Sequence, residues 1–367
     1  MTAPTLILTG IDPMTVESAT ASLQFDLPTA VVVAHRIDRN TNALLRTVSD
    51  ISGVLETERI DLDHACPSCA VREDIIPTLS RLSEVDRWGA IIAQLPIGAS
   101  ALQVCRVCAY ESSSEQFGGT AVSDGIRIGG VLTVVDGESA LRDLTTGDTL
   151  EDRSLPTFRG DNRGVAETLA ALVEYADAIT VLGDIDPAGA DLIDALRRPT
   201  SRLTRDWNGL DSATLTGGIH AHVLAEDWVA EVRRGQLPLP QTPHVWTLEL
   251  SSDRPLDPGR FAAAMEQLCC GTHRIRGCFW LPTRADTVCV MDGAAGQVSI
   301  GAHGPWHGRP LNRLVATGIR EGSDAGALRA AFEQCRLTDS ELAQHGTHWL
   351  SLHDGLEPWL GAIHDLV

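Results

Sequence analysis

The chain has 367 residues, 43% of them apolar, so it can bury a sizeable core and divide into two domains. Its formal net charge of −20 disfavours broad, direct binding to nucleic acid, because the mean field repels a phosphate backbone. No stretch approaches the roughly 20 uninterrupted apolar residues that a membrane-spanning helix needs. The first residues, MTAPTLILTG, also lack the charged region of a signal peptide. We therefore expect a cytoplasmic protein with no membrane partner.

The basic residues have an unusual composition. All 29 are arginine, so the chain contains no lysine. Schiff-base chemistry on a lysine and phosphate binding by a P-loop lysine are therefore excluded.

The first part of the chain alternates apolar, β-branched runs with helical patterns. The expected elements, in chain order, are a strand over 5–10, a helix over 15–24, a strand over 29–38, a helix over 71–85, a strand over 88–96, a strand, turn and helix over 129–144, a helix and strand within 166–186, and a helix over 188–198. This alternation predicts an α/β fold, with a mostly parallel sheet covered by helices on both faces.

The second part of the chain has a different pattern. The proline-rich stretch 233–244 reads as a linker. It is followed by expected strands over 245–252, 277–284, 286–293 and 296–304, and by helices over 258–270 and 325–342. We therefore predict a domain over 1–232, the linker over 233–244, an antiparallel α+β domain over 245–342, and a tail over 343–367.

Several stretches, taken in order, resemble the CobW-type P-loop GTPases, a family of metal chaperones and insertases. HACPSCAVREDIIPTL (64–79) resembles the family's metal motif and its following helix, and VLTVVDGESALRDL (131–144) resembles the strand and helix after the second switch. The stretch GCFWLPTRADTVCVMD (277–292), with GPW (304–306) and ALRAAFEQCRLTDSEL (327–342), is similar to the CobW C-terminal domain. The resemblance implies a P-loop NTPase-like first domain and a CobW-type C-terminal domain.

The nucleotide motifs depart from the family pattern. A P-loop follows GxxxxGK[ST], whereas this chain keeps Gly10 but has Thr15, Val16 and Glu17 at the last three positions. The guanine-binding motif is reduced to GDID (183–186), which retains only Asp186. Gly10 and Asp186 are therefore vestigial nucleotide positions, and the GTPase cycle is predicted to be lost, with GTP and Mg²⁺ not expected as cofactors. Weak nucleotide binding through backbone amides and Asp186 is the opposing interpretation.

Two CxxC pairs stand 36 residues apart. The first is Cys66 and Cys69, and the second is Cys105 and Cys108. Four thiolates form a closed tetrahedral zinc site, so we predict Zn²⁺ bound by both pairs, in loops at the carboxyl ends of neighbouring strands. A three-cysteine site completed by His64 or a carboxylate, a redox pair, and buried structural thiols are the alternatives. No catalytic residue is assigned.

An actinobacterial subgroup of CobW relatives has a CPSC-like motif and is associated with recruiting a ribosome hibernation factor during zinc starvation. The resemblance to it implies a non-catalytic, zinc-responsive adaptor. Its partners would be the hibernation promoting factor and the small ribosomal subunit. The alternative is a CobW-type zinc chaperone that keeps residual GTP binding and delivers metal to a client protein. A zinc-stabilised pseudo-GTPase with an unrelated partner is a third possibility.

Overall fold

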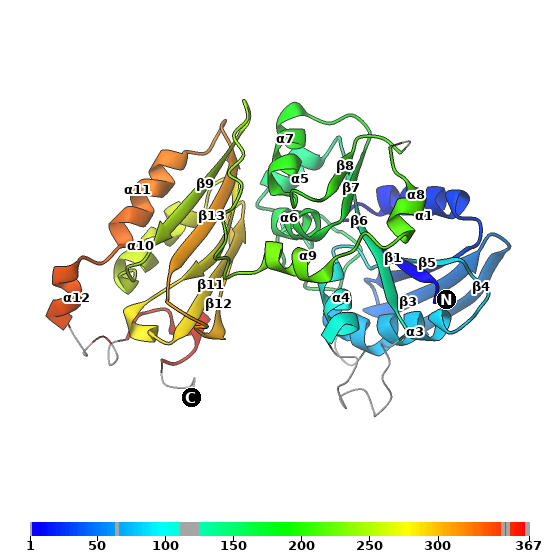
Figure 1. Ribbon diagram of the computed structural model, residues 1–367, viewed down its shortest axis with the longest axis horizontal. Coiled ribbons are helices and arrows are strands. Elements are labelled where there is room, and N and C mark those ends of the chain that lie inside the picture. The colour runs from blue at the N-terminus through cyan, green and yellow to red at the C-terminus, as the bar shows by residue number, and fades with distance from the viewer. Residues whose placement is uncertain are drawn as a thin grey trace. The chain divides into compact units, whose positions relative to one another are not determined.

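The structure is a computed structural model, and it describes residues 2–62, 66–110, 125–207, 209–345, 349 and 353–363. The chain divides into two compact units. The first comprises Met1–Ala140, Asp148–Asp186 and Arg197–Val229, and the second comprises Leu141–Gly147, Pro187–Leu196 and Ala230–Val367. The expected fold class is confirmed: a large, mostly parallel sheet flanked by helices, plus a C-terminal module with an antiparallel sheet (Figure 1).

The first unit is built on an eight-stranded sheet of order β4-β3-β2-β5-β1-β6-β7-β8. Its strands are β1 (Pro4–Thr9), β2 (Ala30–Asp38), β3 (Ala43–Asp50), β4 (Gly53–Ile60), β5 (Ala90–Gln94), β6 (Arg127–Asp136), β7 (Ala178–Leu182) and β8 (Arg202–Thr204). Strands β2, β5, β1, β6, β7 and β8 pair in parallel, while β3 and β4 add an antiparallel hairpin at one edge.

Helices cover both faces of this sheet. They are α1 (Pro13–Asp26), α2 (Pro67–Ala70), the π-helix η1 (Val71–Ile75), α3 (Ile76–Ser83), α4 (Ala101–Tyr110), α6 (Val165–Tyr175), α8 (Ser212–Thr216) and α9 (His222–Val229), while α5 (Ala140–Thr145) begins at the boundary of the two units. Alternation along β1 makes the two cores: Leu6 and Leu8 pack on the side of α1, and Ile7 packs on the side of α3 and α4.

The β3–β4 hairpin is absent from the sequence-based prediction. Its signal was weak because β3 buries Arg46 and Asp50 beside Leu44 and Val48, so polar and apolar side chains share one face. The outer strand β4 is almost wholly exposed. The missed hairpin matters for the site, because Arg46 contacts the helix that follows the first cysteine pair.

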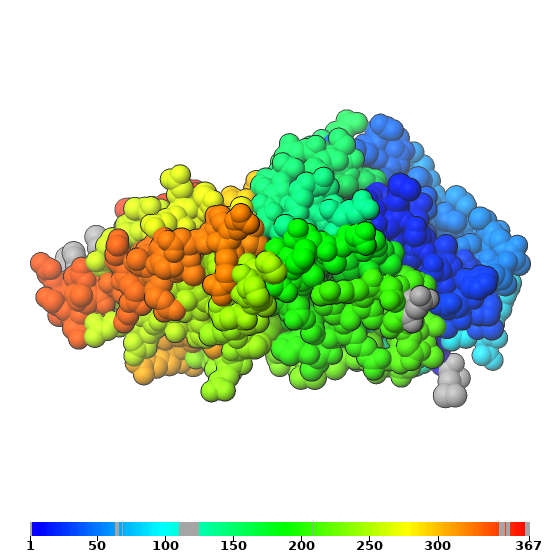
Figure 2. Space-filling model, turned by 90° about the horizontal axis from the view of Figure 1, so that it is seen from above, coloured from blue at the N-terminus to red at the C-terminus, as the bar shows by residue number. Residues whose placement is uncertain are grey.

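The second unit contains a five-stranded antiparallel sheet of order β12-β11-β10-β13-β9. Its elements are α7 (Pro187–Leu196), β9 (Val245–Ser252), α10 (Pro258–Cys269), β10 (His273–Phe279), the 3-10 turn η3 (Pro282–Arg284), β11 (Thr287–Ala294), β12 (Gln297–Pro305), β13 (Asn312–Ile319), α11 (Ala325–Cys335), α12 (Asp339–His345) and α13 (Glu357–Leu360). Figure 2 shows the orange side chains of α11 and α12 on the surface of this unit.

Two expected elements of this unit differ from the structure. The helix expected over 325–342 is divided into α11 and α12, because Arg336 adopts an extended backbone after Cys335. The strand expected over 277–284 begins earlier, at His273, and ends at Phe279 because Pro282 starts the turn η3. One core joins the sheet to α10 and α11, and Phe261 and Phe279 meet in it with ring centroids 4.6 Å apart.

No helix in the described ranges combines the length and the apolar character needed to cross a membrane.

Candidate functional site

The N-terminus of α1 is capped by the chain's own carboxylate. Only residues 10–12 separate β1 from α1, and Pro13 is the first helical residue. Asp12 is the N-cap: its side chain accepts a hydrogen bond from the backbone N–H of Thr15 at 2.7 Å, and its carbonyl accepts one from Val16 at 3.1 Å. In a P-loop, free amides at this place hold phosphate. Here a carboxylate takes the position that an anionic ligand would need.

Gly10 is also closely packed. A Cβ added to it would lie 2.6 Å from Cγ2 of Val16 and 2.9 Å from the carbonyl oxygen of Val134. Its own carbonyl accepts a hydrogen bond from Gly98 at 3.0 Å. Val16, which stands where the P-loop pattern has lysine, is only 1% exposed and belongs to the core beneath α1. The glycine therefore permits close packing between α1 and β6.

The other residues that the resemblance aligned with nucleotide positions, Glu17 and Asp186, are exposed. Glu17 forms an ion pair with Arg36 at 3.0 Å. Asp186 follows β7 and directly precedes α7, with its side chain exposed. Gly10 and Asp186 therefore lie at the same, carboxyl edge of the sheet, after β1 and β7, with β6 between these strands. Sequence analysis did not identify Asp12, although an aspartate before a proline is a common helix-start signal.

The first cysteine pair forms a compact turn. Cys66 precedes α2, and the backbone N–H of Cys69 points to the Cys66 sulfur at 3.4 Å. Arg72 places a guanidinium nitrogen 3.7 Å from the sulfur of Cys69. An N–H group and a positive charge near sulfur both stabilise a thiolate, the form that binds metal. Cys66 is half-buried and Cys69 is buried, at 5% exposed, so only Cys66 is partly accessible from the solvent.

A buried polar network fixes the helix that follows this turn. Asp74, in the π-helix η1, accepts a hydrogen bond from Arg46 of β3 and contacts Nε2 of His35 of β2 at 2.9 Å. Arg46 also donates to Thr78 at 2.9 Å and pairs with Glu56 and Glu58 of β4. The segment after the cysteine turn is therefore anchored to the β2–β4 strands by the contacts of Asp74 and Thr78. Sequence analysis missed these residues because their partners are distant in the chain.

The second cysteine pair lies in helix α4, and the expectation of a loop is wrong for it. Cys105 is 1% exposed in the core, where its thiol interacts with the side chain of Tyr175. Burial raises the pKa of Cys105, and it raises the pKa of Cys108 to about 12. Tyr175 in turn contacts Nδ1 of His222 at 3.0 Å. Both thiols are therefore held in the neutral form in this conformation.

The two pairs border one hydrophobic core, which contains Cys105 and the residues Ala70 and Val71 that follow the first pair. Among the residues that the structure describes, no three histidine, cysteine or acidic side chains converge as metal ligands. His64 lies outside the described residues. The Cys66–Cys69 turn suits thiolate ligation, whereas the buried thiols of α4 would have to move and lose protons to join it. The four-cysteine site remains a prediction.

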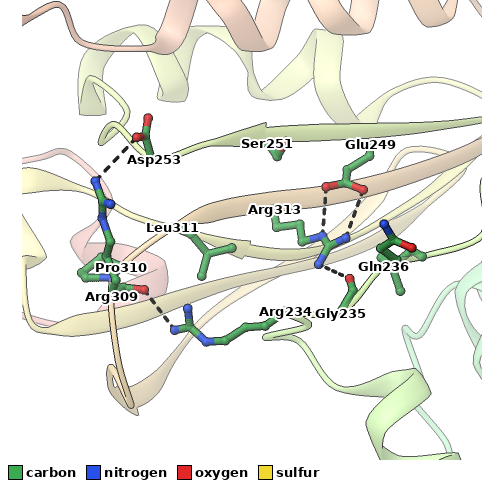
Figure 3. Close-up of a pocket in the computed structure, with 11 residues that line it drawn as sticks. Arg234, Gly235, Gln236, Glu249, Ser251, Asp253, Arg309, Pro310, Leu311 and Arg313 are labelled. Carbon is green, nitrogen blue, oxygen red and sulfur yellow. Dashed lines mark hydrogen bonds and ion pairs between the residues drawn. The ribbon is translucent and has the colours of Figure 1, made fainter.

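A cavity with a volume of about 630 Å³ lies in the second unit (Figure 3). The lining charges neutralise one another. Arg313 pairs with Glu249 at 3.0 Å and donates to the carbonyl of Gly235 at 2.6 Å, and Arg309 lies 3.5 Å from Asp253. None of the sequence-predicted site residues lines this cavity.

Part of the second unit matches the model of a known domain family. Residues 245–336 match the model of the cobalamin synthesis protein cobW C-terminal domain. Residues 245–336 of this unit therefore match the CobW C-terminal domain, as the resemblance of 277–342 implied.

Relatives extend the similarity over most of the chain. The zinc chaperone Rv0106 of Mycobacterium tuberculosis is 29% identical over 296 residues, which cover 75% of this chain and 68% of that protein. The zinc-regulated GTPase metalloprotein activator 1 of Dictyostelium discoideum is 20% identical over 67% of this chain and 54% of its own length. The Zn(II)-bound YjiA GTPase from E. coli aligns over 92% of this chain and 100% of that chain, at 17% identity and a TM-score of 0.36. Together with the match of residues 245–336, the mycobacterial and Dictyostelium proteins support a CobW-type assignment.

Proposed function

We propose that this protein binds zinc at the Cys66–Cys69 turn and handles it as cargo, without turning over GTP. The zinc proposal rests on the geometry of the turn. The backbone N–H of Cys69 points to the sulfur of Cys66, and the Arg72 guanidinium lies close to the sulfur of Cys69. Two thiolates leave coordination positions open, which suits a site that must accept and release its metal. The name of the mycobacterial relative, a zinc chaperone, points in the same direction.

The absence of GTP turnover rests on the α1 N-terminus. Asp12 engages the Thr15 amide, Val16 is buried where the P-loop lysine would be, and no lysine exists elsewhere in the chain. Binding of a triphosphate would require its charge to approach a carboxylate without a compensating ammonium group.

Zinc binding is tested by titrating the metal-free, reduced protein against a chromophoric chelator. We expect the Cys66→Ser, Cys69→Ser double variant to lose at least about tenfold in affinity, since a thiolate ligand pair is removed. Cys270→Ser, which changes an exposed thiol in the other unit, is the matched control and should bind as the wild type does. Unchanged affinity in the double variant would refute the proposed site. Cys105→Ser then tells whether the second pair contributes.

Nucleotide binding is tested separately, by calorimetric titration of the zinc-loaded protein with GTP and Mg²⁺. We expect no saturable heat. Saturable binding would overturn the loss of GTP turnover while leaving the zinc site standing. It would favour the chaperone that couples residual GTP binding to metal delivery.

A second candidate function is the adaptor that brings a ribosome hibernation promoting factor to the small ribosomal subunit in response to zinc. The closed α1 N-terminus favours it, because a scaffold needs no nucleotide cycle. Its acidic surface suits contact with basic proteins. In a sedimentation assay with purified ribosomes, the protein should increase the bound fraction of the factor without GTP. A strict requirement for GTP, or no effect, would exclude this function.

A further inference from the structure

A second polar cavity, of about 270 Å³, lies in the first unit. Asp177 directly precedes β7 and Arg202 begins β8, so the cavity is at the amino edge of the parallel strands. This is the edge opposite to Gly10 and Asp186. Arg198, Thr200 and a wall of Ile219, Ala221 and Leu224 complete the lining. The cavity is therefore separate from the former nucleotide edge and from the cysteine turn.

The acceptors of the only acidic residue lining this cavity are already used. Oδ1 of Asp177 accepts a hydrogen bond from Arg198 at 2.5 Å. Its Oδ2 accepts one from the backbone N–H of Val131 at 2.9 Å and contacts Nδ1 of His220 at 2.8 Å. Asp177 is 3% exposed, so these internal groups are its main partners.

The donors, in contrast, exceed the acceptors. Arg198 is 6% exposed, and its Nε and one terminal nitrogen, NH1, have no hydrogen-bond partner in the described part of the chain. A buried donor without an acceptor is costly, and a guanidinium more so because it is charged. Arg202 brings a second positive charge to the same cavity. This excess of hydrogen-bond donors and of positive charge favours a ligand that is anionic and carries several hydrogen-bond acceptors.

We propose that this cavity binds a small oxyanion, namely a phosphate group, through Arg198 and Arg202. The guanidinium group matches tetrahedral oxyanions in charge and hydrogen-bonding geometry. The apolar wall of Ile219, Ala221 and Leu224 accommodates the uncharged part of a phosphate ester. The larger cavity of the second unit does not support the same argument, because its arginines are paired with Glu249, Asp253 and main-chain carbonyls.

The proposal is tested by titrating the full chain with inorganic phosphate and with ribose 5-phosphate, at constant ionic strength set with chloride. We expect saturable binding to the wild type, and at least about tenfold weaker binding to Arg202→Gln, because a charge-assisted hydrogen bond is lost. Arg205→Gln is the matched control: it removes the same charge from an exposed residue that does not line the cavity, and it should bind as the wild type does.

The two ligands distinguish the sources of the phosphate group. Tighter binding of ribose 5-phosphate, lost in Arg202→Gln, indicates a phosphate ester; equal binding indicates the free ion. The double variant Arg198→Gln, Asp177→Asn removes the buried cation together with its counter-charge, and should also abolish binding while remaining folded by circular dichroism. No saturable binding to the wild type, or equal affinities for Arg202→Gln and Arg205→Gln, would overturn the proposal.

Discussion

At the scale of single residues, Asp12 and Val16 determine how the segment between β1 and α1 is capped and packed. Asp12 is the N-cap of α1, so the helix already begins at Pro13. In the P-loop pattern, the equivalent residues belong to the phosphate-binding loop that precedes the helix. Val16 then faces the core instead of a ligand. The two observations are consistent with each other, because a helix that begins at Pro13 directs the side chain of residue 16 into the core.

Replacing Val16 by lysine should therefore fail to restore nucleotide binding. The ammonium group would be buried against Gly10 and Val134, at a cost of about 3 kcal/mol or more in the free energy of unfolding. Val16→Ala, the control for lost packing, should cost about 2 kcal/mol. Urea unfolding measures both values, and calorimetry with GTP and Mg²⁺ checks the binding. A stable, GTP-binding Val16→Lys protein would contradict the packing described here.

Sequence reasoning predicted the loss of GTP turnover from residue types alone, since Val16 and Glu17 lack the ammonium group and the hydroxyl of the P-loop pattern, and this stays a prediction. It could not predict the capping of α1 by Asp12, because that depends on where the helix begins. It likewise predicted a helix after Cys66 and Cys69, although Cys69 itself lies in α2, and it could not predict that Cys105 would be buried near Tyr175, 70 residues further along.

At the scale of elements, the π-helix η1 connects the cysteine turn to the sheet. A π-turn in a helix is uncommon and is often found at functional sites. Here it directs Asp74 toward both His35 and Arg46. The β3–β4 hairpin supplies Arg46, and sequence patterning missed this hairpin because its buried face mixes charged and apolar residues. The predicted parallel strands were easier, because long β-branched runs mark them.

Asp74→Asn should loosen this connection. The neutral amide keeps the shape of the carboxylate but not its charge, while Arg46 retains Glu56 and Glu58. We expect a loss of about 2 kcal/mol in the free energy of unfolding, measured by urea denaturation. Glu73→Gln, which changes a pair with the exposed Arg72, should cost less than about 1 kcal/mol. Equal effects of the two variants would show that the Asp74 network does not stabilise the fold.

The C-terminal segment of the second unit is held by a buried ion pair between Arg284 and Asp354, 2.7 Å apart. Arg284 also donates to the carbonyls of Leu360 and Gly361. Burial alone would raise the pKa of Asp354, but hydrogen bonds from Arg284, the Leu356 N–H and Thr283 outweigh it and hold that pKa below its ordinary value. The carboxylate therefore stabilises the fold above the unfolded pKa of about 4, and this stability is lost as the pH falls through the lower, folded value.

Hydrogen exchange over residues 353–363 measures this effect. Protection in the wild type should be constant near neutral pH and decline below about pH 4. Asp354→Asn should show low protection throughout, because one partner of a buried pair is gone, at a cost of about 3–5 kcal/mol. Asp253→Asn, in an exposed pair with Arg309, should behave as the wild type. Wild-type protection in Asp354→Asn would show that the ion pair does not hold the segment.

At the scale of the whole molecule, the two units differ in how readily their folds could be predicted from the sequence. The C-terminal unit was recognisable from local motifs, and its CobW C-terminal domain is confirmed. The first unit has the sheet and helices of an α/β protein, and this fold was predictable from hydrophobic patterning, whereas the contacts of the site residues were not. Packing constrains many positions together, whereas a binding site depends on a few side chains.

The outermost strand β4 has a practical consequence. Its free edge ends the eight-stranded sheet, and Val54 and Leu55 are 67% and 42% exposed. Glu56, Glu58 and Arg59 place charges along the same strand, which discourages pairing with another copy. Concentrated samples should therefore stay dispersed near neutral pH and form aggregates rich in intermolecular β-structure once acid neutralises these glutamates, a risk to weigh when choosing a buffer for storage or crystallisation.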